Sequence, residues 1–279
     1  MMFPLPRSIR VLVLAPSLLL ILALVLSLFF APPAKAGVAD DLLAVGQLRF
    51  QSQRLTKLYL QSGLQIQPET ARTQLQRASR QMDGVFGQLA PYGRQSRTAS
   101  HLARARSLWG ELQQALAAPY SSSALQRVLG AGDDLMLASG KLSLLIEEQG
   151  DGGMGRLLDL SLRQNMLAQR LARLYLMGLA GDQSQGRVVD TEQARREFNT
   201  ALAELAAARE NTPAAREALE LARMQWLFFD QALVGGGRGA GSDPHSLARN
   251  VATTSERIAE VLEAVSHQYV RASALGISG

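Results

Sequence analysis

The stretch that decides the fold is GQLRFQSQRLTKLYL, residues Gly46 to Leu60, because most of it returns later in the chain. Residues 51–60 (QSQRLTKLYL) come back 116 residues further on as residues 167–176 (LAQRLARLYL). Both copies keep Gln-Arg-Leu, Leu-Tyr-Leu and a basic residue between them. Self-similarity of this kind indicates a duplicated domain.

The two arginines of the first copy are candidate ligand-binding groups. On a helix, Arg49 and Arg54 lie on the two edges of one apolar stripe, roughly 140° apart. A second helix, or a second subunit in a homodimer, would therefore have to close a site that used both. Guanidinium groups with Ser52 and Gln53 as nearby neutral donors suit a planar oxyanion, which takes bidentate, charge-assisted hydrogen bonds. The alternative is that these arginines cover the stripe and keep their charged ends in water.

The second copy is not identical to the first. Arg170 matches Arg54, but Asn165 stands where Arg49 would be, and Arg163 stands where the first copy has Gln47. Arg163 and Arg170 are seven residues apart, so they share one helix face to within about 20°. The two copies therefore cannot make identical sites.

Composition favours helical bundles and excludes several classes of function. Only 5% of residues are aromatic and there is no cysteine, which rules out a disulfide framework, a thiolate metal site and a cysteine nucleophile. The net charge of +5 comes largely from the N-terminal segment, so no nucleic-acid-binding surface is indicated. The three histidines are isolated, and no nucleophile, base and orienting group can be proposed together. We expect no enzyme activity, no metal and no cofactor.

The first 36 residues have the pattern of a secretory signal peptide. Arg7 and Arg10 precede an apolar run over residues 11–31, and Ala34-Lys35-Ala36 has the A-x-A arrangement of a cleavage site. The competing interpretation is an uncleaved anchor, because about 20 apolar residues can span a bilayer. Both place the rest of the chain outside the cytoplasm, in the periplasm or an equivalent compartment, and the second tethers it to the inner membrane.

Proline, glycine and capping residues predict four helices on each side of Gly150-Asp151-Gly152-Gly153. Trp226 follows Trp109 by 117 residues, which extends the repeat beyond its opening helix. The predicted fold is all-α, with two tandem four-helix bundles over residues 37–150 and 151–279 after the signal peptide. The expected helices cover residues 40–63, 68–90, a third ending near 118, a fourth capped by one of Ser121 to Ser123, then about 157–179, 191–209, 213–234 and 244–274.

Residues 46–55 (GQLRFQSQRL) resemble the opening helix of the PilJ-type domain, the N-terminal sensor domain of type IV pilus methyl-accepting chemotaxis transducers. They are also similar to the nitrate-recognition helix of NarX-type, NarQ-type and NIT-type sensors. The PilJ-type pattern is close to Gly-Arg-Gln-Arg-Met-Leu-Ser-Gln-Arg. The first copy keeps Gly46, Arg49, Ser52, Gln53 and Arg54, and the second keeps Arg163, Gln164, Met166, Leu167, Gln169 and Arg170.

The resemblance implies an extracytoplasmic sensor for a small anion, with nitrate or nitrite as the ligand. Arg49 matches the anion-contacting arginine and Arg54 a second arginine of that motif, whereas Asn165 departs from it. Neither a HAMP segment, a kinase nor a methyl-accepting coiled coil follows, so occupancy would pass to a membrane-bound signalling protein or another envelope partner. The alternative function is a structural or interaction protein of the envelope or of the pilus and chemotaxis system, without a small-molecule ligand.

Overall fold

The computed structural model describes residues 37–150, 153–235 and 243–275, so the predicted leader over residues 1–36 lies outside the described residues. The described part is helical without a strand, which confirms the all-α prediction. None of its helices is both long enough and apolar enough to cross a membrane. Its helices are α2 (Val38–Gly63), α3 (Pro68–Gln88), the 3-10 helix η2 (Ala90–Arg94), α4 (Ala99–Leu116), α5 (Ser122–Glu147), α6 (Gly153–Leu179), α7 (Gln185–Ala207), α8 (Pro213–Gly235) and α9 (Pro244–Ala274).

Capping side chains explain where several helices begin. Ser121 Oγ accepts a hydrogen bond from the backbone N–H of Ala124 at 3.2 Å, as expected for the N-cap of α5. Helix α7 starts six residues before the predicted Thr191, because Ser184 Oγ accepts from the backbone N–H of Arg187 and caps the helix there.

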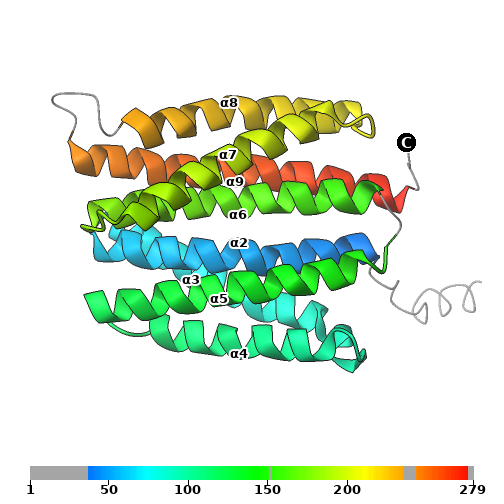
Figure 1. The fold of residues 1–279 in the computed structure, drawn as a ribbon, viewed down its shortest axis with the longest axis horizontal. Helices are drawn as coiled ribbons and strands as arrows, with labels where there is room; N and C mark the ends of the chain where they lie inside the picture. The colour runs from blue at the N-terminus through cyan, green and yellow to red at the C-terminus, as the bar shows by residue number, and fades with distance from the viewer. Residues whose placement is uncertain (1–36, 151–152, 236–242, 276–279) are drawn as a thin grey trace, which may run out of the picture. The chain divides into compact units, whose positions relative to one another are not determined.

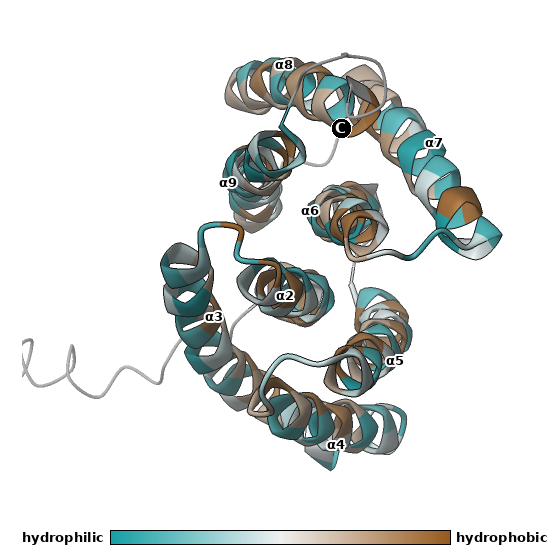
Figure 2. Cartoon of the chain, turned by 90° about the vertical axis from the view of Figure 1, so that its left-hand side faces the viewer, coloured by the Kyte–Doolittle hydropathy of each residue, from teal (hydrophilic) through white to brown (hydrophobic). Residues whose placement is uncertain are grey.

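Four helices form the centre of the bundle (Figures 1 and 2). Helices α2 and α6 pack against each other in the same direction, with Leu42 beside Gly155 and Gly46 beside Leu162. Helix α5 packs on α2 and α9 packs on α6, each antiparallel to its neighbour. The remaining helices lie outside these four: α3 on α2, α4 on α5, α7 on α6 and α8 on α9.

Residues on both sides of position 150 belong to the same large hydrophobic cluster. The cluster includes fully buried Leu48 and Leu55 of α2 together with Leu157 and Leu171 of α6. Residues 37–279 accordingly form one compact unit. The domain boundary near residue 150 stays a prediction, and the structure adds that the two sets of four helices bury their central helices against each other.

The two tryptophans occupy corresponding places in the two sets of helices. Trp109 of α4 is buried and donates its indole N–H to Asp83 Oδ1 of α3 at 3.1 Å. Trp226 of α8 is buried and donates to Asn199 Oδ1 of α7 at 2.8 Å. Each indole ring thus packs in the core, while its N–H donates a hydrogen bond to a side chain of the neighbouring outer helix. The duplication itself stays a prediction from the sequence repeat.

Candidate functional site

The central helices carry charged groups into the core. Lys57 of α2 is fully buried, with 0% of its surface exposed, and Arg173 of α6 is 3% exposed. Charged side chains this deeply buried need partners, because removing a charge from water costs several kcal/mol or more. The partners of these two residues define the polar centre of the bundle.

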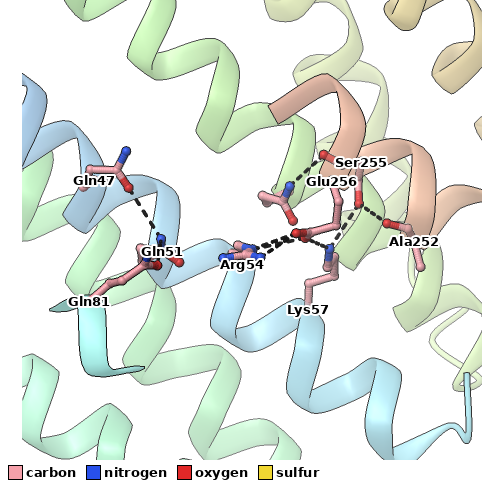
Figure 3. Close-up of polar contacts among 9 residues, drawn as sticks. Gln47, Gln51, Arg54, Lys57, Gln81, Ala252, Ser255 and Glu256 are labelled. Carbon is pink, nitrogen blue, oxygen red and sulfur yellow. Dashed lines mark hydrogen bonds and ion pairs between the residues drawn. The ribbon is translucent and has the colours of Figure 1, made fainter. Parts of the chain in front are cut away.

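Lys57 and Arg54 meet at one carboxylate on the last helix, Glu256 of α9 (Figure 3). Arg54 donates to both oxygens of Glu256, with Nη2 2.6 Å from Oε2 and Nε 3.1 Å from Oε1. Lys57 Nζ donates to Oε1 of the same residue and, at 3.1 Å, to Ser255 Oγ. Burial alone would raise the pKa of Glu256, but the charges of Lys57 and Arg54 outweigh it and lower the pKa to about 2.

A corresponding contact joins α6 to α5. Arg173 Nη1 donates to Asp133 Oδ1 at 2.8 Å, and Gln53 Nε2 of α2 donates to the same oxygen at 3.0 Å. Lys57 and Arg173 are 116 residues apart and are the basic residues that stand between Gln-Arg-Leu and Leu-Tyr-Leu in the two copies of the sequence repeat. Lys57 of α2 therefore pairs with α9, the last helix of the second set of four, and Arg173 of α6 pairs with α5, the last helix of the first set. These two ion pairs connect the two halves of the chain.

Arg49 makes a third contact between the halves. It is 8% exposed, and its Nη2 donates to Asp159 Oδ1 of α6. Ser143 Oγ of α5 donates to the same oxygen at 3.1 Å. Glu147 lies close by, and its pKa is raised by burial and by the negative charge of Asp159, against the lowering effect of Arg49. The Arg49 guanidinium thus faces α6 in the interior, and not bulk water.

A cavity of about 430 Å³ opens beside the Arg49–Asp159 pair. Its walls come from α2 and α5 on one side and from α6 and α7 on the other, so residues of both halves line it. The lining residues are Arg49, Met136, Leu137, Gly140, Lys141, Leu144, Asp159, Arg163, Met166, Leu167, Arg170, Asp190, Gln193, Ala194 and Glu197. This volume lies within the range of small-molecule sites.

The structure separates the six candidate ligand-binding residues into two groups. Arg49, Arg163 and Arg170 line the cavity, and the last two share one face as their spacing predicts. Arg54 instead contacts Glu256, Gln53 contacts Asp133, and Ser52 Oγ donates to the backbone carbonyl of Arg49 at 2.7 Å. These three residues do not line the cavity.

Sequence reasoning did not identify the acidic partners Asp133, Asp159 and Glu256. They come from helices distant in sequence, and no motif marks them. Lys57 and Arg173 were not identified either, because they lie off the predicted apolar stripe. The signal that could have pointed to them is that a basic residue returns at the same place in both copies of the repeat.

Fold and cavity together define an all-α helical bundle with a cavity and charged groups at the contact between its two sets of helices. Residues 37–134 match the family model "Type IV pili methyl-accepting chemotaxis transducer N-term" (PilJ). The match covers about a third of the chain and ends within α5. That family comprises sensor domains of chemotaxis transducers, which are typically extracytoplasmic, and it is not an enzyme family. Comparison with curated proteins and with solved structures finds no match.

Proposed function

We propose that residues 37–279 act as an extracytoplasmic sensor-type module that binds a small charged ligand in the cavity between α2, α5, α6 and α7. The observation that carries this proposal is that Arg49, Arg163 and Arg170 converge on one cavity of about 430 Å³ whose walls come from both halves. A ligand there would touch both halves at once. Its occupancy could then alter how they pack, which a membrane-bound signalling partner would detect.

Nitrate and nitrite are the ligands that the sequence resemblance suggests. To bind them, Arg49 would use the donors that now contact Asp159, and Arg163 and Arg170 would turn from Glu197 and Asp190. Arg163 and Arg170 can turn towards a ligand at a smaller energetic cost than Arg49, because their ion pairs are partly exposed and such pairs contribute at most about 1 kcal/mol. The family match over residues 37–134 supports the sensor class without naming the ligand.

Calorimetric titration of residues 37–279 with nitrate, nitrite and chloride tests the proposal. The informative variants are Arg163→Gln and Arg170→Gln, because both side chains lie at the cavity and neither is fully buried. A hydrogen bond to a charged group contributes about 1.5–3 kcal/mol, so each variant should weaken binding about tenfold or more. Arg156→Gln is the matched control, since Arg156 lies on the same helix but pairs with Glu204 outside the cavity. Equal affinities for all four proteins would contradict the assignment.

One observation favours the second candidate, an interaction module without a small ligand. Helix α8 exposes Leu221, Met224, Leu227 and Phe228, the last with 64% of its surface in solvent. The positions 117 residues earlier on α4 are also exposed, but they are polar or small: Arg104, Ser107, Gly110 and Glu111. Of these two corresponding helices, α8 therefore offers an apolar face and α4 does not, and such a face would suit a protein partner or a second copy.

Sedimentation analysis distinguishes this candidate from the first. If α8 mediates association, Leu227→Ser combined with Phe228→Ser should abolish it while every ligand titration remains flat. Association that survives both substitutions would exclude α8 as the contact, and ligand heats that depend on Arg163 would favour the sensor.

A further inference from the structure

The cavity presents both signs of charge. Its cations are Arg49, Lys141, Arg163 and Arg170, and its carboxylates are Asp159, Asp190 and Glu197. Each carboxylate is paired with one arginine: Arg163 Nη2 is 2.9 Å from Glu197 Oε2, Arg170 Nη2 is 3.2 Å from Asp190 Oδ2, and Arg49 contacts Asp159. The charged part of the lining therefore consists of three arginine–carboxylate pairs and one further positive charge, that of Lys141.

A simple anion fits this charge pattern poorly. Beside Arg163 or Arg170 it would lie next to the carboxylate that each arginine already contacts, Glu197 or Asp190, and the two negative charges would repel each other. A ligand that carries both signs avoids this cost, because its carboxylate can take the place of Glu197 at Arg163 while its ammonium group takes the place of Arg163 at Glu197. Opening the original pair costs little, since both side chains are substantially exposed.

The apolar part of the lining indicates what else the ligand carries. Leu137 and Leu144 of α5 line the cavity, yet each has 59% of its surface exposed. Met136 and Met166 lie deeper, and methionine side chains adapt their shape to an apolar guest. Nitrate would leave most of about 430 Å³ empty, because a four-atom ion displaces little more than one or two waters of about 30 Å³ each. An aliphatic chain would fill this space and cover the exposed leucines.

We infer that the cavity takes a zwitterion with an apolar side chain, the chemical class of the free aliphatic amino acids. The ligand carboxylate contacts Arg163, its ammonium group contacts Glu197, and its aliphatic chain packs on Leu137 and Leu144. This inference rests on the proposed function, because it names the ligand class of the same cavity.

Calorimetric titration with L-leucine and three truncated analogues tests the inference. 4-Methylvalerate lacks the amine, 3-methylbutylamine lacks the carboxylate, and L-alanine lacks most of the aliphatic chain. L-Leucine should bind at least tenfold more tightly than each analogue and than nitrate. Equal affinity for L-leucine and 4-methylvalerate would overturn the inference, because the cavity would then recognise any apolar carboxylate.

A variant of one acidic residue makes the test specific to the cavity. Glu197→Gln removes the partner of the ammonium group, so L-leucine should bind at least tenfold more weakly while 4-methylvalerate binds as well as before or better. Glu204→Gln is the matched control on α7, because Glu204 pairs with Arg156 outside the cavity. Equal losses for both ligands would overturn the assigned role of Glu197. Binding of nitrate without L-leucine would overturn the inference and leave the proposed function standing, whereas flat titrations with every compound would overturn both.

Discussion

Lys57 is the residue whose surroundings explain most about the polar centre of this protein. Its ammonium group is fully buried between α2 and α9, where burial lowers its pKa and the negative charge of Glu256 opposes that shift. Arg54 shares the same carboxylate. The cluster holds two cations and one anion inside the bundle, so its stability depends on Glu256 remaining charged.

Replacing Glu256 with glutamine should destabilise the fold strongly. The substitution keeps the shape but leaves Lys57 buried without a counter-charge, and breaking a buried pair in this way costs about 3–5 kcal/mol. Chemical denaturation measures the change in the free energy of unfolding. Glu260→Gln on the same helix is the control, because Glu260 is exposed and should change stability by no more than about 0.5 kcal/mol. Similar losses for both variants would show that the buried charge is not the cause.

The same carboxylate should make stability depend on pH in the acid range. The pKa of Glu256 is about 2 in the folded protein, against an ordinary value of 4.5. Because the folded-state pKa is lowered, its contribution is fully present above about pH 4.5 and is lost as the pH falls towards 2. Denaturation curves at several pH values should therefore show a steeper loss between pH 4.5 and 2 for the wild type than for Glu256→Gln. Parallel losses would mean that other groups control acid unfolding.

At the scale of elements, the approach of α2 to α6 depends on one glycine. A Cβ atom at Gly46 would lie 2.6 Å from Leu162 Cδ1 and 2.9 Å from its Cγ. Leu162 is itself buried at 1% exposure, so its side chain has little room to move. Leucine packed directly on a glycine lets the two helix backbones come close together.

Gly46→Ala should therefore destabilise the protein by about 1–3 kcal/mol, as expected for overpacking. The control is Gly110→Ala on α4, where nothing lies within 4 Å of the added Cβ and the gain in helix propensity is about 0.5–1 kcal/mol. Combining Gly46→Ala with Leu162→Ala should cost less than the sum of the single changes, because the added methyl then occupies vacated space. Thermal unfolding of the two single variants, the double variant and the Gly110→Ala control measures these changes, and additive losses would contradict the contact between Gly46 and Leu162.

The helices could be predicted from the sequence more fully than the contacts between them. Caps such as Ser121 and the apolar spacing act locally, so they indicate where helices lie. The spacing of Arg163 and Arg170 likewise predicted their shared face. The pairing of Arg54 with Glu256 joins residues about 200 positions apart, and no local pattern encodes it. The same holds for the cavity, whose walls come from four helices of both halves.

Taken as a whole, residues 37–279 are expected to unfold as one cooperative body. The hydrophobic core continues across the predicted boundary near residue 150, and ion pairs cross it at Arg49, Lys57 and Arg173. A ligand in the shared cavity can act on both halves only if they are coupled in this way. Separable halves would unfold independently.

The two tryptophans allow the most direct measurement of this coupling, because Trp109 lies on α4 and Trp226 on α8. In Trp226→Phe the fluorescence reports only the first half, and in Trp109→Phe only the second. Within each variant, the denaturant midpoint from tryptophan fluorescence should coincide with the midpoint from helical circular dichroism, as two-state unfolding requires. Fluorescence that changes at a clearly different denaturant concentration from the loss of helix, in either variant, would show that the halves unfold separately and would contradict the account.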